Sequence, residues 1–413
     1  MPSNDQSARA TTGKWLSVVG IGEDGVAGLG DDAKSLIRNS EAVFGGKRHL
    51  ALAASLISGE AISWPSPFDT TMAAIRQLRG RPVCVLASGD PFLHGVGATL
   101  AKQVDPREMR VVPHASSFSL AAARLGWPLQ EVETISLHGR ELAHIRPLLH
   151  DQRKIIALTS DETGPKALAM NLSEWGFGHS VLHVMEALGG PYEKITRQTS
   201  AGFDLPAVNP LNLVAISVVA DGPDAEIPLS VGLPDTLFDH DGQITKREIR
   251  AMTLSALAPR KGELLWDIGA GAGSVSIEWM LCHPSMRAIA IERDEARAAR
   301  IQSNAQSLGV PDLQVVTEAA PEALDGLPTP DAIFIGGGGS NPKLMDTVIS
   351  RLPANGRLVA NAVTLEMESM LLQRRAQLGG DLVRLAVSRA APVGTMNGWR
   401  PAMPVTQWIW VKP

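Results

Sequence analysis

Residues 266–275 read Trp-Asp-Ile-Gly-Ala-Gly-Ala-Gly-Ser-Val, an apolar segment that runs into a loop with glycine at every second position. Apolar residues precede this loop over 264–266, and bulky residues at helical spacing follow it over 275–281. The stretch predicts a buried strand, a glycine loop and a helix, in that order. Because glycine lacks a Cβ, the backbone amides of such a loop can approach a nucleotide-like ligand closely.

Two carboxylates accompany the loop. Asp267 lies two residues before Gly269, and Glu292 ends the next apolar run, where an acid can accept both hydroxyls of a ribose. The Gly-x-Gly-x-Gly spacing departs from the Gly-x-Gly-x-x-Gly pattern of dinucleotide sites, which weakens a pyrophosphate interpretation. A plain strand-to-helix turn and a nicotinamide site stay open as alternatives at this point.

These acids and glycines resemble the S-adenosylmethionine site of the Rossmann-like, class I methyltransferases. The resemblance implies that the loop passes the methionine part of the cofactor, that the second acid holds the ribose, and that two alanines lie near the adenine. The implied cofactor contacts are Asp267, Gly269, Ala270, Gly271, Ala272, Gly273, Glu292, Ala319 and Ala320. Apolar runs predict the rest of an α/β fold with about seven strands, at 288–291, 313–317, 331–335, 356–360, 382–387 and 405–411.

Composition limits the classes of protein that fit. The chain has 413 residues, of which 44% are hydrophobic and 20% are charged, and this favours two soluble domains. The formal net charge of -5 gives no general attraction to nucleic acid or to an anionic membrane, so we expect neither partner. The two cysteines make no disulfide framework and no Cys-x-x-Cys metal site, and the polar first dozen residues lack an apolar leader. We therefore expect a cytoplasmic protein.

Proline, glycine and acidic residues gather at 220–234 and disfavour both helix and central strand. We expect the chain to divide there. The predicted parts are a disordered tail, a first domain, a linker and a second domain, at 1–13, 14–221, 222–236 and 237–413.

The first domain opens with another strand that ends in glycines. An apolar strand over 15–19 is followed by a predicted helix over 31–39. A short strand over 42–44 then leads into a predicted turn over 45–49. Alone, this pattern identifies no ligand.

A further strand over 82–86 ends in Gly89-Asp90-Pro91, three residues typical of turns. Ser116 and Ser117 are suited to cap a small-residue helix that follows over 120–126. The motifs Ser-Leu-His-Gly-Arg, Val-Met-Glu-Ala-Leu-Gly-Gly-Pro-Tyr-Glu and Asn-Pro-Leu-Asn-Leu-Val come later, at 136–140, 184–193 and 209–214.

This order of motifs resembles the tetrapyrrole methylases, the class III methyltransferases, which consist of two α/β lobes with S-adenosylmethionine between them. The resemblance covers about residues 14–221. It implies cofactor contacts at Gly89, Asp90, Ser116 and Ser117.

A tetrapyrrole methylase followed by a Rossmann-like methyltransferase resembles the fused precorrin methyltransferases of cobalamin synthesis over nearly the whole chain. Support comes from the motifs at 45–50, 136–140 and 242–248. The resemblance implies a tetrapyrrole substrate, one S-adenosylmethionine per domain and a homo-oligomer. It also implies methylation at carbon 5 by the first domain, and methylation at carbon 15 with loss of carbon dioxide by the second.

The substrate implied here carries several carboxylates, so cationic and donor side chains are expected in both clefts. In the first domain the candidates are Lys47, Arg48, His49, His138 and Arg140. In the second domain Thr245 is expected at the cofactor, and Lys246, Arg247, Arg389 and Arg400 are candidates for substrate carboxylates. Each of these cations taken alone is more often a solvated surface charge.

The glycine run at 336–339 follows the fourth strand of the second domain, and we expect Gly337 and Gly338 to leave room for a large flat substrate. A mobile loop is the alternative. Methyl transfer from a sulfonium requires alignment and exclusion of water, so no metal is expected, and the sequence assigns no catalytic acid or base. Two other functions stay open, a nicotinamide-dependent oxidoreductase and a non-catalytic scaffold that senses a tetrapyrrole.

Overall fold

The computed structural model describes residues 13–65 and 70–413. The expected disordered tail over 1–13 therefore lies, except for Gly13, outside the described residues. The chain forms two compact units. The first unit ends at Ala225 and excludes the segment Glu141–His150, which packs with the second unit.

The first unit contains two five-stranded sheets. In the first sheet all neighbouring strands are parallel and their order is β3-β2-β4-β1-β5. Its strands are β1 Leu16–Ile21, β2 Ala42–Gly45, β3 Glu60–Ser63, β4 Val83–Ser88 and β5 Met109–Val112. The helices in this part of the unit are α1 Asp31–Arg38, α2 Lys47–Ala53, α3 Thr70–Gln77 and α4 Val96–Leu100.

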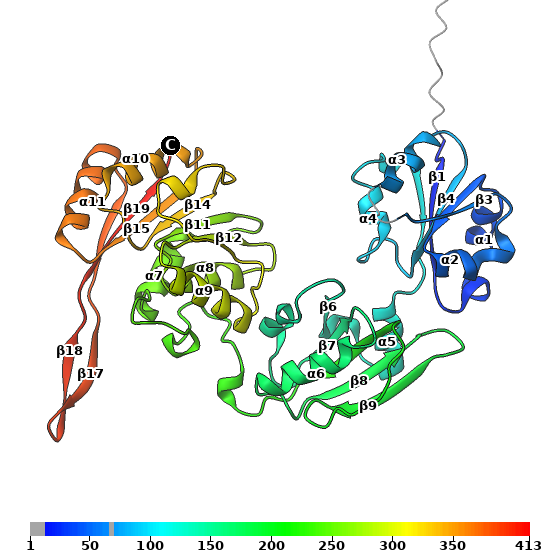
Figure 1. Ribbon diagram of the computed structural model, residues 1–413, viewed down its shortest axis with the longest axis horizontal. Helices are drawn as coiled ribbons and strands as arrows, with labels where there is room; N and C mark the ends of the chain where they lie inside the picture. The colour runs from blue at the N-terminus through cyan, green and yellow to red at the C-terminus, as the bar shows by residue number, and fades with distance from the viewer. Residues whose placement is uncertain (1–12, 66–69) are drawn as a thin grey trace, which may run out of the picture. The chain divides into compact units, whose positions relative to one another are not determined.

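The second sheet of this unit has the order β6-β7-β10-β8-β9 and is antiparallel except for the pair β6 and β7. Its strands are β6 Val132–Ser136, β7 Lys154–Leu158, β8 Val181–Glu186, β9 Lys194–Thr199 and β10 Asn212–Ser217. Helices α5 Ser117–Leu125 and α6 Gly164–Glu174 belong to the same part of the chain, drawn in cyan and green in Figure 1.

Two local predictions for the first unit can be compared with the structure. The predicted turn over 45–49 is wrong, because Lys47 begins helix α2 after Gly46; the run 47–53 consists mainly of good helix formers. The predicted cap at Ser116 is confirmed, since its Oγ accepts a hydrogen bond from Ser119 N at 3.1 Å. Ser117 is instead the first residue of α5.

The second unit contains a seven-stranded sheet, which confirms the predicted fold class. The strand order is β13-β12-β11-β14-β15-β19-β16, and only β19 runs antiparallel to its neighbours. The strands are β11 Leu264–Ile268, β12 Arg287–Ile291, β13 Gln314–Val316, β14 Ala332–Ile335, β15 Arg357–Ala362, β16 Asp381–Leu385 and β19 Val405–Val411.

Five helices cover this sheet: α7 Arg247–Leu257, α8 Ser274–Leu281, α9 Glu295–Ser307, α10 Pro342–Arg351 and α11 Leu365–Leu378. Side chains of β11 alternate between two cores, as the period of a strand requires. Leu265 packs with residues of α7, α8 and α9, whereas Trp266 packs with residues of α10 and α11. Asp267, next along the strand, therefore faces the α8 side of the sheet.

A hairpin of β17 Ser388–Val393 and β18 Met396–Pro401 lies between β16 and β19 in the chain and extends away from the sheet of its own unit (Figure 1). The sequence patterns did not predict it. Elsewhere, apolar residues of the expected linker are buried, since Ile227 and Leu233 belong to the core of the second unit. Among the described residues, no helix combines the length and apolar character needed to cross a bilayer.

A buried ion pair joins α7 to α8. Arg250 is fully buried and Glu278 is 2% exposed, and Arg250 Nε donates to Glu278. The carboxylate also accepts from Gly232 N at 2.6 Å and Leu233 N at 2.9 Å, and the guanidinium donates to the carbonyl of Thr245. This pair therefore attaches the loops at 232–233 and at 245 to helices α7 and α8.

We predict that Glu278→Ala lowers the free energy of unfolding of the second unit by about 3 kcal/mol, because the buried Arg250 loses its fully buried partner and keeps only Asp235, whose Oδ1 lies 3.1 Å from Arg250 Nη1. Urea unfolding of the full chain, followed by tryptophan fluorescence, measures this change. The control is Glu366→Ala, an exposed acid in the first turn of α11, which should cost less than about 1 kcal/mol. Equal effects of the two substitutions would contradict the prediction.

Candidate functional site

A cavity of about 640 Å³ lies in the second unit where the glycine loop leaves β11. This volume is typical of small-molecule sites, and the carboxyl ends of parallel strands are their usual place. Its lining includes residues 242–246, the glycine loop, the ends of β12 and β13, and residues 336–338, together with residues of α7, the end of β15 and the segments around 387–389 and 402–405.

The glycines of the loop are required by close approach and by backbone conformation. Gly269, Gly271 and Gly273 have φ values of +71°, +60° and +75°. A Cβ on Gly269 would stand 2.8 Å from the backbone of Gly337, and one on Gly271 would stand 2.8 Å from the carbonyl oxygen of Gln243. Side chains at these positions would push the surrounding backbone away.

Asp267 lies beneath the loop and does not border the cavity. It is 1% exposed, and its Oδ2 accepts from Ser276 N at 3.1 Å and from Ser276 Oγ at 2.6 Å. Its Oδ1 is buried and has no hydrogen-bond partner among the described residues. Burial raises the pKa of Asp267 to about 6, against the opposing effect of the Ser276 hydrogen bonds.

Glu292 borders the cavity directly at the end of β12. Its Oε2 accepts from Gly271 N at 2.9 Å, and its Oε1 accepts from Asp294 N at 3.1 Å. Each carboxylate oxygen can accept a further hydrogen bond. Glu292 can therefore hold the glycine loop and accept from a ligand at the same time.

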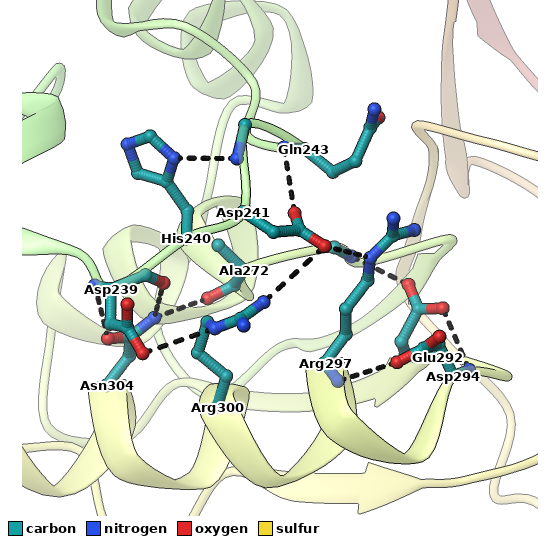
Figure 2. Close-up of polar contacts among 12 residues, drawn as sticks. Asp239, His240, Asp241, Gln243, Ala272, Glu292, Asp294, Arg297, Arg300 and Asn304 are labelled. Atoms are coloured by element: carbon teal, nitrogen blue, oxygen red, sulfur yellow. Dashed lines mark hydrogen bonds and ion pairs between the residues drawn. The ribbon is translucent and has the colours of Figure 1, made fainter.

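Residues 239–246 form a segment that crosses from α9 to the cavity, and Figure 2 shows how α9 holds it. Arg297 Nε donates to Asp241 Oδ2 at 2.8 Å, and Arg300 Nε donates to Asp239 Oδ2 at 3.2 Å. The hydrogen bond from Arg297 lowers the pKa of Asp241 to about 2. Asp241 in turn accepts from Gln243 N at 3.0 Å, which fixes the turn whose carbonyl contacts Gly271.

Asn304 of α9 joins this segment to the glycine loop. Its Oδ1 accepts from Asp239 N at 2.8 Å, and its Nδ2 donates to the carbonyls of Asp239 and Ala272, both at 3.0 Å (Figure 2). The side chain is 3% exposed. One buried amide thus satisfies backbone groups on both sides of the cavity wall.

The sequence-predicted residues of the second unit fall into two groups. Those that border the cavity are Thr245, Lys246, Gly269, Ala270, Gly271, Glu292, Ala319, Ala320, Gly337, Gly338 and Arg389. Those that do not are Asp267, Ala272, Gly273, Arg247 and Arg400. Arg389 forms an ion pair with Glu248, which also borders the cavity.

The first unit has a separate cavity of about 340 Å³. Arg48, His49, Gly89, Asp90, Ser116 and Ser117 border it, whereas Lys47, His138 and Arg140 do not. Gly89 has a φ of +53°, and a Cβ there would stand 3.0 Å from the carbonyl oxygen of Ala115. The turn after β4 therefore requires glycine, as the loop after β11 does.

Three structurally important residues were not identified from the sequence as site residues: Ser88, Gln243 and Asn304. Asn304 is a polar residue among apolar ones on the buried face of α9, with Ile301 and Ala305, and that contrast is a signal in the sequence. Ser88 ends β4 directly before Gly89 and borders the first cavity. Gln243 contributes a backbone carbonyl, for which its side chain gives no signal.

Comparison with known proteins places the chain in a family. It matches the family Tetrapyrrole (Corrin/Porphyrin) Methylases over residues 16–203 and the Precorrin methyltransferase domain over residues 236–412. A precorrin-6Y C(5,15)-methyltransferase [decarboxylating] from Sinorhizobium sp is 57% identical, with 100% of both chains covered. The chain belongs to the precorrin-6Y C5,15-methyltransferase family. It is therefore a methyltransferase, and methylases of this family use S-adenosylmethionine.

Shorter proteins are similar to parts of this C5,15-methyltransferase family member. A cobalt-precorrin-6B C(15)-methyltransferase (decarboxylating) from Salmonella typhimurium is 35% identical and covers 39% of this chain and 85% of its own. A cobalt-precorrin-7 C(5)-methyltransferase from the same organism is 30% identical and covers 44% of this chain and 88% of its own. These similarities support neither the oxidoreductase nor the scaffold alternative.

Asp267 makes the free energy of unfolding of the second unit fall as the pH rises. Its folded-state pKa of about 6 lies above the ordinary value of 3.8, so the folded state holds the proton more tightly than the unfolded state. Below about pH 3 the group is largely protonated in both states, and the cost of burying its charge grows to about 3 kcal/mol as the pH rises past 6.

We predict that Asp267→Asn exceeds the wild type in free energy of unfolding by only about 0.5 kcal/mol at pH 4 but by about 3 kcal/mol at pH 7, because the amide is never charged. Urea titrations of the full chain between pH 4 and pH 7 measure the difference. A difference that does not change with pH over this range would contradict the prediction.

Proposed function

We propose that this chain methylates precorrin-6Y at carbons 5 and 15 and removes carbon dioxide from the acetate side chain of ring C, giving precorrin-8 in cobalamin synthesis. The observation that carries this proposal is the full-length similarity to a decarboxylating C(5,15)-methyltransferase. The two separate cavities, one within each unit, support two methyl transfers on one chain.

We assign methylation at carbon 5 to the first domain, over 14–221, and methylation at carbon 15 with decarboxylation to the second, over 237–413. A methylase family matches each domain, which supports one methyl transfer per domain. Each domain would bind one S-adenosylmethionine, which supplies a methyl group from a sulfonium when bound.

The residues of the second cavity fit such a cofactor. Glycines 269 and 271 border the cavity without side chains that would enter it, Glu292 has acceptor capacity for ribose hydroxyls, and Ala319 and Ala320 offer an apolar surface for adenine. Asp267 would act from below the loop, where its unpartnered Oδ1 adds negative charge near a cationic ligand. Thr245 would contact the cofactor from the 239–246 segment.

The first cavity would hold its cofactor differently. Gly89 and Asp90 form the turn after β4, and Ser116 and Ser117 stand at the start of α5. The Ser116 Oγ is already engaged as a helix cap, so its role toward a ligand would be to fix the end of the helix. The Ser117 side chain borders the same space.

Substrate carboxylates would meet the cationic groups that border each cavity, Arg48 in the first unit and Lys246 and Arg389 in the second, and the neutral His49 would offer a hydrogen-bonding group beside Arg48. Lys47, His138 and Arg140 do not border the first cavity. Gly337 has open space around its Cα, since even a Cβ added there would stand 3.8 Å from the Cα of Gly269, and this supports close approach of a flat macrocycle. Gly338 borders the same space.

Three further properties complete the proposal. The enzyme would work without a metal, since alignment and exclusion of water suffice for methyl transfer. It would work in the cytoplasm, consistent with the free thiols of Cys84 and Cys282. It would form a homo-oligomer, for which the exposed apolar side chains Met396 and Trp399 on the β17–β18 hairpin are suited.

The division of labour is tested by disabling one site at a time. Valine is strained at a positive φ, so Gly89→Val should abolish methylation at carbon 5 and leave decarboxylation and methylation at carbon 15. Gly269→Val should have the opposite effect. Mass spectrometry of the product from precorrin-6Y and S-adenosylmethionine counts methyl groups and lost carbon dioxide. The control is Gly30→Val, where φ is -71° and an added Cβ meets no atom within 4 Å, and this variant should make the wild-type product.

If either glycine variant loses both methylations while it still binds cofactor in the other unit, the assignment of one reaction to each unit is wrong. If both variants form the complete product, neither loop is the methyl-donor site.

Asn304→Leu tests the support of the second site. The substitution removes three hydrogen bonds that hold the 239–246 segment against the glycine loop, so the Kd for S-adenosylhomocysteine should rise about tenfold or more. Calorimetry in a Gly89→Val background isolates the second site. Gln302→Leu, an exposed position on the same helix, is the matched control, and equal affinities of the two variants would count against this role.

A further inference from the structure

We propose that Ser88 and His49 form a proton relay in the first cavity, in which the Ser88 hydroxyl removes the hydrogen of carbon 5 and His49 receives the proton. The inference rests on the proposed assignment of carbon 5 to the first unit. It supplies the acid–base chemistry that the sequence left unassigned.

The reaction at carbon 5 requires a proton acceptor. A bridging carbon between two pyrrole-type rings carries one hydrogen, and its conjugated electron pair forms the new bond to the methyl group while the carbon–sulfur bond breaks toward sulfur. The ring system is then cationic and still carries that hydrogen. When the carbon–hydrogen bond breaks, its electrons restore the conjugation, and the proton must pass to a base.

Ser88 is placed to meet the substrate. It is the last residue of β4, is exposed, borders the cavity and directly precedes Gly89 of the proposed methyl-donor turn. A hydroxyl at this position would stand beside the carbon that receives the methyl group. Ser88 is therefore the residue proposed to touch the reacting atoms.

His49 and Arg48, from the start of α2, converge on this hydroxyl. The Ser88 Oγ lies 2.8 Å from His49 Nε2 and 2.9 Å from Arg48 Nη2, and Arg48 Nη2 lies 3.0 Å from His49 Nε2. Arg48 also forms an ion pair with Glu23, which borders the same cavity. A nucleophile-type hydroxyl next to an oriented imidazole is the usual arrangement for proton transfer between the two groups.

The direction of these hydrogen bonds follows from the chemistry of the donors. A guanidinium only donates, so Arg48 Nη2 can donate to Ser88 Oγ, which leaves the single lone pair of an unprotonated His49 Nε2 for another donor. The hydroxyl of Ser88 is then directed to donate to the same Nε2. The remaining ring nitrogen, Nδ1, is buried and has no hydrogen-bond partner among the described residues. The imidazole therefore presents its lone pair toward Ser88.

The surroundings keep this imidazole neutral before the reaction. Burial, with the nearby Arg48 charge, lowers the pKa of His49 to about 4, so Nε2 is free to accept a proton at neutral pH. A weak base suffices, because a hydrogen on a methylated carbon of a cationic ring is strongly acidic. The same low pKa lets His49 return the proton to water once product leaves.

A substrate with deuterium at carbon 5 tests the relay. In Ser88→Ala we expect the kcat for methylation at carbon 5 to fall about 100-fold with little change in KM, and proton removal to become rate-limiting. Deuterium should then slow the variant severalfold while the wild type responds little. His49→Ala should behave alike and recover activity with added imidazole. His179→Ala, an exposed histidine in the same unit, should match the wild type.

Two further readouts separate the possible failures. Cofactor binding in the first unit, and decarboxylation with methylation at carbon 15, should stay intact in Ser88→Ala, which shows that the chain is folded. Wild-type rates in Ser88→Ala, or a slow variant without a deuterium effect, would overturn the relay. Persistent methylation at carbon 5 in Gly89→Val would instead overturn the assignment of that reaction to the first unit.

Discussion

Close backbone contact among three segments is the constraint on which the second site depends. The carbonyl oxygen of Gln243 lies 2.8 Å from the place that a Cβ on Gly271 would take, and the backbone of Gly337 lies 2.8 Å from the place that a Cβ on Gly269 would take. Three segments far apart in the chain therefore meet at the glycine loop. The glycines of the loop and of the 336–338 segment border the cavity together with the Glu292 carboxylate, a surface suited to a cofactor recognised through backbone amides and a carboxylate.

Side chains outside the cavity hold these backbones in place. Asn304 and two arginines of α9 hold residues 239–243 on one side, and the buried Arg250 bonds the carbonyl of Thr245 on the other. Since Arg250 is neutralised by Glu278 in the interior, the charge that supports the segment is itself compensated. The cavity wall is thus supported by interactions that a bound ligand need not touch.

Much of this architecture follows from local patterns. Short apolar runs, and a glycine loop between strand and helix, predicted the seven-stranded sheet. Parallel strands that are buried on both faces give such continuous apolar runs. The helix cap at Ser116 was equally local. The turn expected over 45–49 failed because two glycines mask a helix start at Lys47.

Other features depend on contacts between distant residues and leave little local signal. The hairpin of β17 and β18 packs on no apolar face, so its residues show no clean alternation. The position of Asp267 beneath the loop follows from its hydrogen bonds to Ser276 in α8. Ser88 converges with Arg48 and His49 because β4 and α2 lie side by side in the first unit. In the chain, Ser88 is 40 residues from Arg48 and 39 residues from His49.

One chain with two independent methyl-donor sites should bind two molecules of S-adenosylhomocysteine. Isothermal titration of the full chain with this ligand measures that number. We expect two bound molecules per chain, one lost in Gly89→Val and the other lost in Gly269→Val. A single bound molecule per wild-type chain, lost in only one of these variants, would contradict this expectation.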